Sequence, residues 1–138
     1  FASAGIAGLE GWPMDDQMAA ELRARGGSAE GFRARRLTGA LAHEADLLLV
    51  MSHEHRIFIL DEWPDLVRRT WLLGQAARVA SQLTAAANDG RGLVSALRAN
   101  PAPPLSTDGV PDPYRRGSSA ATRSAKLIET ALRQVFGA

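Results

Sequence analysis

Short apolar runs and longer segments of helical spacing alternate along the chain. Residues 46–51, Asp-Leu-Leu-Leu-Val-Met, form a continuous apolar run bounded by polar residues, which is typical of a strand buried on both faces of a parallel sheet. Residues 70–74 repeat this pattern, and residues 1–5 read as a short strand running into a glycine turn. Three strands are therefore predicted.

Helical spacing predicts helices between these strands, and three of them begin at residues that make good N-caps. Gly26 and Gly27 end the first helix, and Trp63 with Pro64 breaks the third after about residue 61. The three caps are Asp15, Thr38 and Ser52.

Further helical segments follow the last predicted strand, over residues 75–88, 93–99 and 118–136. The Pro-rich residues 101–104 separate the last two as an extended connector, able to move the following loop or hold it off the core. The final helix ends at Gly137 and carries one apolar face, made of Ala125, Ile128, Leu132 and Val135.

Strands that alternate with helices predict an α/β sandwich built on a parallel sheet. Ligands of such sheets bind beyond the carboxyl ends of the strands. The loops that begin at Gly5, Ser52 and Gly74 would gather at that edge, together with the turn around Asp112.

Length and charge place the chain among ordinary soluble domains. Its 138 residues suit one domain with a sizeable core, and 46% apolar with 22% charged residues indicates neither disorder nor a fibrous repeat. Sixteen basic against fifteen acidic residues leave a net charge of +1, which argues against a nucleic-acid or acidic-membrane binder. No apolar run approaches the ~20 residues that span a bilayer, and no signal-peptide pattern is present, so we expect no membrane insertion and a cytoplasmic location.

Cysteine is absent from the sequence, which excludes disulfides, thiolate metal sites and a cysteine nucleophile within these residues. His53 and His55 are two positions apart and point in different directions on a helix, so they do not chelate one metal as an i, i+4 pair does. We take both as surface or rim histidines, and no metal site or cofactor is predicted.

One stretch presents a carboxylate at the start of the last helix, and we call residues 110–117 the acid turn. Pro111 and Pro113 flank Asp112, so φ is fixed on both sides and Asp112 is pushed out of the α region. Taken alone, this pattern is also typical of a simple helix-entry turn with a capping aspartate.

The chain resembles the low-molecular-weight protein tyrosine phosphatases in five motifs that follow the family's order. These motifs are Ser3-Ala4-Gly5, Gly11-x-Pro13-Met14-Asp15, Ala34-Arg35-x-Leu37-Thr38, Ala45-Asp46-Leu47-Leu48-Leu49-Val50-Met51 and Asp112-Pro113-Tyr114. Residues 69–73 and the long segment to Asp108 are similar to the extended bacterial, actinobacterial-type members, which resemble phosphatases of cell-surface polysaccharide systems.

The resemblance implies a three-layer α/β sandwich with a small parallel sheet, of the phosphotyrosine phosphatase I type. In that family the thiolate of a Cys-x5-Arg loop attacks phosphorus, and the aspartate of the Asp-Pro-Tyr motif protonates the leaving phenolate. A phenolate with a pKa of about 10 leaves poorly without a proton, and general acids of this kind contribute ~10² to 10⁴ in rate. The matching acid is Asp112.

Other residues receive roles from the same motifs. Tyr114 and Leu9 would form walls of the cleft that receives the substrate ring, and Ser3 would support the phosphate loop. Phe32 departs from the family, whose members often carry a histidine there that supports the same loop.

The decisive departure is that the strand, Cys-x5-Arg loop and helix expected before Ser3 are not in the sequence, a unit of roughly 30 residues. We therefore expect residues 1–138 to be a single domain without its first strand, carrying a helical and Pro-rich insertion at residues 75–108. No base is placed to activate the hydroxyl group of Ser3 or Ser52. Residues 1–138 without the Cys-x5-Arg unit should therefore have no phosphatase activity. The first strand would lie between residues 1–5 and 46–50, leaving them 9 to 10 Å apart rather than directly paired.

Three functions remain open. The first is a tyrosine phosphatase whose partner is a phosphotyrosine-containing protein, such as a bacterial tyrosine kinase of a polysaccharide system. The second is a non-catalytic interaction domain that recognises a partner through Arg115, Arg116 and the acid turn. The third is an arsenate reductase of the same fold, which the Asp-Pro-Tyr motif disfavours. The oligomeric state does not follow from the sequence.

Overall fold

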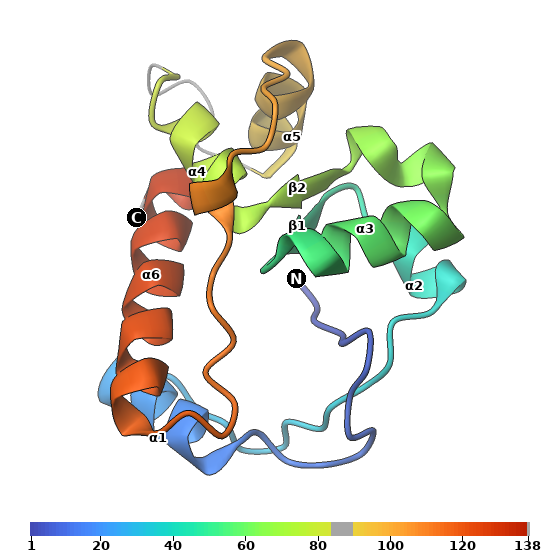
Figure 1. Cartoon of the computed structure of the whole chain (residues 1–138). Helices are drawn as coiled ribbons and strands as arrows, with labels where there is room; N and C mark the ends of the chain where they lie inside the picture. The colour runs from blue at the N-terminus through green and yellow to red at the C-terminus, as the bar shows by residue number, and fades with distance from the viewer. Residues whose placement is uncertain (84–89, 138) are drawn as a thin grey trace.

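Two short parallel strands lie among the helices of the fold (Figure 1). The structure is a computed structural model that describes residues 1–83 and 90–137. In chain order the elements are α1 (Asp16–Ala24), α2 (Gly39–Glu44), β1 (Leu48–Val50), α3 (His53–Glu62), the 3₁₀-helix η1 (Pro64–Arg68), β2 (Thr70–Leu72), α4 (Leu73–Ala80), α5 (Gly90–Ala99), the 3₁₀-helix η2 (Ser106–Asp108) and α6 (Ser118–Phe136).

The sheet confirms two of the predicted strands at shorter lengths. β1 and β2 pair in parallel, with Leu49 opposite Trp71. All of β2 is buried, whereas in β1 only Val50 is fully buried. The prediction of a third strand at residues 1–5 is wrong, because within the described part of the chain those residues make only a lone parallel bridge, between Gly5 and Arg36.

The first residues pair away from the sheet. Gly5 N donates to Arg35 O at 2.9 Å, and Leu37 N donates to Gly5 O at 2.8 Å. Among the described residues no backbone hydrogen bond joins residues 1–5 to residues 46–50. Direct pairing there would have contradicted the predicted topology.

The sheet separates two clusters of buried side chains, because successive residues of a strand point to opposite faces. Trp71 and Leu73 pack with α4, α5 and α6 on one face. Leu72 and Val50 pack with residues of α2, α3 and η1 on the other. Figure 1 shows α4 and α6 on one side of the strands and α3 on the other. This arrangement confirms the α/β sandwich.

The predicted caps hold the helices around this sheet. The Asp15 carboxylate accepts hydrogen bonds from Gln17 N and Met18 N at the start of α1. The hydroxyls of Thr38 and Ser52 accept from the backbone of α2 and α3 in the same way. These three helix starts are confirmed.

Two helix predictions need correction. The helix expected at residues 75–88 begins earlier, as α4 at Leu73, and ends at Ala80, while residues 84–89 lie outside the described residues. On α6, Ala125 and Val135 are buried as expected, but Leu132 is 38% exposed. Leu132 therefore lies at the rim of the apolar face. No described helix is long and apolar enough to cross a membrane.

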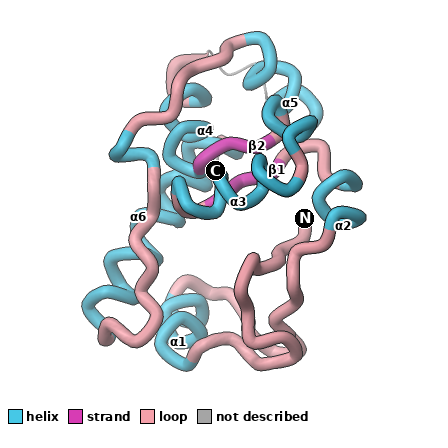
Figure 2. Tube along the Cα trace, turned by 45° about the vertical axis from the view of Figure 1, so that its right-hand side comes forward, coloured by secondary structure: helices cyan, strands magenta, loops and turns pink. Residues whose placement is uncertain are grey.

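α1 lies at the opposite end of the molecule from α5, beside the first half of α6 (Figure 2). Two polar contacts join it to α6. Arg25 pairs with Glu129 at 3.0 Å, and Thr122 donates its hydroxyl hydrogen to Glu21. The start of α6, next to the acid turn, is thereby held against α1.

Candidate active site

The acid turn carries its aspartate exposed to solvent. One carboxylate oxygen of Asp112 accepts a hydrogen bond from Tyr114 N at 3.0 Å, so the side chain closes its own turn. α6 begins only at Ser118, and its N-cap residue is Gly117 with φ of 88°. Asp112 therefore does not cap α6, and the simple interpretation as a capping residue is wrong.

Two hydrogen bonds fix where this turn lies. Val110 N donates to the carbonyl oxygen of Met51, the residue that follows β1, at 2.7 Å. The Ser124 hydroxyl of α6 donates to Pro111 O at 2.8 Å. The acid turn is thus held beyond the carboxyl end of β1, the edge where the sequence predicted it.

Beyond Asp112 the chain makes a left-handed step. Arg115 has φ of 57°, and its guanidinium group lies 5.1 Å from the centre of the Tyr114 ring. Arg115 is thus placed for a cation–π contact with this ring, and Tyr114 as a residue is still 44% exposed. The Tyr114 side chain therefore offers an aromatic surface beside Asp112.

The two predicted site residues from the start of the chain lie on the surface. Leu9 is 49% exposed, and the carbonyl oxygen of Ser3 accepts a hydrogen bond from Arg35 Nε at 2.7 Å. Within residues 1–83 and 90–137, no hydrogen bond or ring contact joins Ser3 or Leu9 to Asp112 or Tyr114. Their roles at the site remain predictions.

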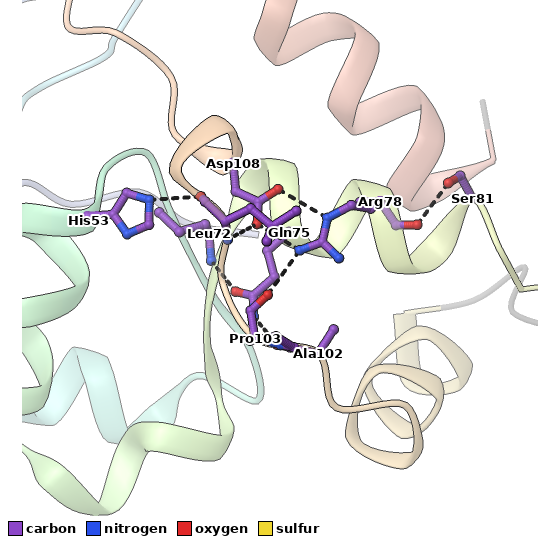
Figure 3. Close-up of polar contacts among 9 residues, drawn as sticks. His53, Leu72, Gln75, Arg78, Ser81, Ala102, Pro103 and Asp108 are labelled. Atoms are coloured by element: carbon purple, nitrogen blue, oxygen red, sulfur yellow. Dashed lines mark hydrogen bonds and ion pairs between the residues drawn. The ribbon is translucent and has the colours of Figure 1, made fainter.

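An ion pair between the partly exposed Arg78 and the buried Asp108 precedes the acid turn, and the sequence did not predict it. Asp108, the last residue of η2, is 5% exposed. Its carboxylate accepts hydrogen bonds from Arg78 Nη2 at 2.8 Å, Arg78 Nε at 3.3 Å and Leu105 N at 2.7 Å (Figure 3). Because thirty positions separate arginine from aspartate, no short motif indicates the pair.

The electrostatics of this pair favour the charged forms. Burial by itself raises the pKa of Asp108, but the hydrogen bonds from Arg78 and Leu105 N and the nearby positive charge hold that pKa below its ordinary value. The hydrogen bonding that Arg78 donates to the Asp108 carboxylate raises the pKa of Arg78. Both groups are therefore ionised at neutral pH.

Further bonds attach the Pro-rich connector to the same helix (Figure 3). Gln75 Nε2 donates to Ala102 O at 2.6 Å, and Arg78 Nη2 donates to Pro103 O at 3.1 Å. His53 Nε2 donates to Leu105 O at 3.0 Å from the start of α3. The connector is bonded to α4, and the residue that follows it, Leu105, is bonded to the first residue of α3, so the following loop is not held off the core.

A separate cavity of about 300 Å³ lies between α6 and the residues around η2. None of the predicted site residues lines it, so it is distinct from the expected substrate cleft. Its polar lining includes Thr107, Asp108, Arg123, Lys126, Thr130 and Gln134. Among the described residues no group of three or more histidine, cysteine or acidic side chains is placed to hold a metal ion.

Relatives of known sequence point in one direction. No family model matches the chain. The low-molecular-weight protein-tyrosine-phosphatase Etp of Escherichia coli K12 is 28% identical over 129 residues, which cover 94% of this chain and 68% of Etp. A probable low-molecular-weight protein-tyrosine-phosphatase of Ralstonia solanacearum, EpsP, is 34% identical over 73 residues, which cover 53% of this chain and 50% of EpsP.

A solved structure agrees with these sequences. The Wzb protein of Vibrio vulnificus, determined in complex with benzylphosphonate, has a TM-score of 0.69 and 26% identity, and the match covers 99% of this chain and 78% of Wzb. The chain is similar in sequence and fold to low-molecular-weight protein tyrosine phosphatases. This finding agrees with the resemblance carried by the five motifs.

The fold of this chain is also similar to that of a phosphatase that acts on arginine rather than tyrosine. YwlE of Geobacillus stearothermophilus, an arginine phosphatase, has a TM-score of 0.72 at 18% identity, and the match covers 99% of this chain and 71% of YwlE. Such a likeness shows the fold alone. The substrate therefore has to be argued from the residues of the site.

Proposed function

We propose that this chain is the acid-bearing part of a protein tyrosine phosphatase, in which Asp112 is the general acid. The single observation that carries the proposal is the position of the acid turn, which Val110 N and Ser124 Oγ hold beyond the carboxyl end of β1. The 138 residues contain no cysteine, and the resemblance implies that a Cys-x5-Arg segment would supply the thiolate nucleophile.

The first half of the reaction transfers the phosphoryl group to sulfur. The thiolate attacks phosphorus, an S–P bond forms, and the bond between phosphorus and the tyrosine oxygen breaks. Asp112 gives its proton to the leaving oxygen, which departs as a neutral phenol rather than as a phenolate. Exposure of the Asp112 carboxyl group at the turn supports this role, because the leaving oxygen arrives from solvent.

Hydrolysis of the cysteinyl phosphate completes the cycle. Water attacks phosphorus, the S–P bond breaks, and the Asp112 carboxylate accepts the proton that the water loses. One residue thus acts first as an acid and then as a base, and its charge returns to the starting value.

Substrate recognition is assigned to the surfaces around the acid. The exposed face of Tyr114 lies two positions from Asp112 and suits contact with an aromatic ring. Leu9 would form a second wall, and Ser3 would support the phosphate loop. The proposed substrates are phosphotyrosine proteins, and the resemblance to the extended bacterial type favours a tyrosine kinase of a polysaccharide system in the cytoplasm.

The test uses a polypeptide that joins a Cys-x5-Arg strand, loop and helix to this chain. We expect it to release phosphate from a phosphotyrosine peptide, and to be at least tenfold slower on phosphoarginine and phosphoserine peptides of the same sequence. The 138 residues alone should release none. Turnover by the isolated chain, or a joined polypeptide that binds the peptide without hydrolysis, would contradict the proposal and favour an interaction domain.

A further inference from the structure

The segment that leads into the acid turn is tied to the body of the fold at almost every step. His53 holds Leu105, and Arg78 holds Asp108. Val110 is bonded to Met51, and Pro111 to Ser124. These bonds come from α3, α4, the end of β1 and α6, so four separate elements determine the path of residues 105–111.

The ion pair between Arg78 and Asp108 is the contact of this segment that joins two opposite charges. Asp108 is 5% exposed, and its two carboxylate oxygens accept hydrogen bonds from Nε and Nη2 of the Arg78 guanidinium group. Two hydrogen bonds from a planar guanidinium fix the orientation of a carboxylate as well as its distance. A single hydrogen bond from a lysine ammonium group would fix the distance of the carboxylate but not its orientation.

The tie also orders η2 itself. The Oδ2 atom that accepts from Arg78 accepts from Leu105 N as well, so the carboxylate closes the 3₁₀ turn. Arg78 adds a bond to Pro103 O on the other side of η2. Arg78 therefore contacts the chain both before η2, at Pro103, and at the last residue of η2, Asp108.

We propose that Arg78 is a positioning residue of the phosphatase reaction, which acts through Asp108 to hold the acid turn where Asp112 reaches the leaving oxygen. The inference rests on the proposed function. Arg78 itself touches neither substrate nor the reacting atoms.

The short distance along the chain makes this coupling strong. Asp112 lies four positions after Asp108, with three residues between them, a span of at most ~14 Å when extended. Pro111 lies within that span with its φ fixed, so a displaced η2 cannot be absorbed by rotation there. Because a shift of about 1 Å at a reacting group costs up to ~10²-fold in rate, small movements of η2 matter.

The experiment compares variants of the joined, active polypeptide on two substrates that differ in how much they need a proton. Phenyl phosphate has a poor leaving group, and 4-nitrophenyl phosphate has a better one. We expect Arg78→Met to lower kcat for phenyl phosphate about tenfold or more, within the ~10² to 10⁴ that a general acid supplies, and kcat for 4-nitrophenyl phosphate by a clearly smaller factor. Arg78→Lys should fall between the parent and Arg78→Met.

A matched control removes an ion pair that lies away from the segment. Arg133 pairs with Glu129 at 3.0 Å on the exposed side of α6, and Arg133→Met should leave both rates unchanged. Asp108→Asn is the second probe, since an asparagine oxygen can still accept from Leu105 N. The loss of kcat in Asp108→Asn should depend on the leaving group as it does in Arg78→Met. If Arg78→Met fails to fold, Asp108→Asn alone tests the positioning role.

The outcomes separate this inference from the proposed function. If Asp112→Asn depends on the leaving group while Arg78→Met and Asp108→Asn lower both rates equally or not at all, the positioning role is refuted and the phosphatase stands. If the joined polypeptide has no activity, or Asp112→Asn shows no such dependence, the proposed function itself fails. A uniform loss with a lowered unfolding midpoint would mark Arg78 as structural only.

Discussion

The backbone of Asp108 lies so close to Gly74 that a Cβ atom at Gly74 would come within 2.5 Å of the Asp108 carbonyl oxygen. Gly74 belongs to the first turn of α4, directly after β2. The carboxyl end of β2 and the turn that precedes the acid turn are therefore in direct contact, and the contact requires a residue without a side chain.

Gly74→Ala should destabilise the fold by about 1–3 kcal/mol, the usual range for forcing an extra carbon into a filled space. The atoms in the way belong to the Asp108 backbone, which cannot rotate aside as a side chain can. Gly8→Ala is the control, because nothing lies within 4 Å of a Cβ there. Urea unfolding measures both, and equal stabilities for the two variants would disprove the close contact.

Asp112→Asn tests the acid in the joined, active polypeptide. Asparagine keeps the acceptor for Tyr114 N but has no proton to give, so the turn should survive while acid catalysis is lost. Turnover of phenyl phosphate should fall by roughly 10² or more, with a smaller loss for 4-nitrophenyl phosphate. Equal losses on both substrates would remove Asp112 from the role of general acid.

Tyr114→Ala tests whether the exposed ring contacts substrate. The variant should weaken binding of an aryl phosphate more than binding of inorganic phosphate, because only the former has a ring to stack. Leu9→Ala should show the same difference on a smaller scale. The inhibition constants of phenylphosphonate and of phosphate measure this difference in binding. Identical changes for both ligands would show that the Tyr114 side chain does not contact the substrate ring.

Local sequence signals predicted most of the framework. The caps at Asp15, Thr38 and Ser52 were predictable because each side chain bonds to backbone only two or three residues ahead. β2 was predictable because it is buried on both faces, which requires an unbroken apolar run. Such features are decided within a few positions.

The features that the sequence did not predict correctly depend on contacts between segments that are far apart in the chain. Residues 1–5 read as a strand, but a strand needs a partner, and the structure pairs only Gly5, with Arg36 and its neighbours. The Arg78–Asp108 pair depends on how α4 meets η2, which no local pattern encodes. At the acid turn the two prolines indicated exposure correctly, but not that Asp112 bonds to Tyr114 instead of capping α6.

The pH dependence of stability should reveal the buried ion pair. Because the pKa of Asp108 is lower in the folded state, its contribution is present above the unfolded value of about 4 and is lost as pH falls through the folded value. The stability gap between the parent and Asp108→Asn should therefore narrow below about pH 4. Urea unfolding at pH 6 and pH 3 measures it, and a constant gap would contradict an ionised Asp108.

Arg78→Met provides the opposite case for the same carboxyl group. Burial still raises the pKa of Asp108 in this variant, while the hydrogen bonds and the charge of Arg78 that lower it are gone, so the pKa of Asp108 in the folded variant should lie above that in the folded parent. Acid should then cost Arg78→Met less stability than it costs the parent. A parent and variant that lose stability equally between pH 6 and pH 3 would show that Arg78 does not set this titration.

The outer edge of β1 carries the last prediction. Leu48 N donates to Arg69 O on the β2 side, and Leu49 pairs in register with Trp71. Because backbone groups along a strand alternate in direction, the N–H of Leu49 points to the edge away from β2. A strand supplied by the Cys-x5-Arg segment would accept that hydrogen bond.

Amide hydrogen exchange at Leu49 can therefore distinguish the isolated chain from the joined polypeptide. We expect the Leu49 amide to exchange much more slowly once the added strand pairs with β1, whereas Leu48, already bonded to Arg69, should change less. NMR exchange measured on both proteins gives the two protection factors. Unchanged protection at Leu49 would mean that the added strand does not pair with this edge, and would overturn the topology on which the position of the thiolate loop depends.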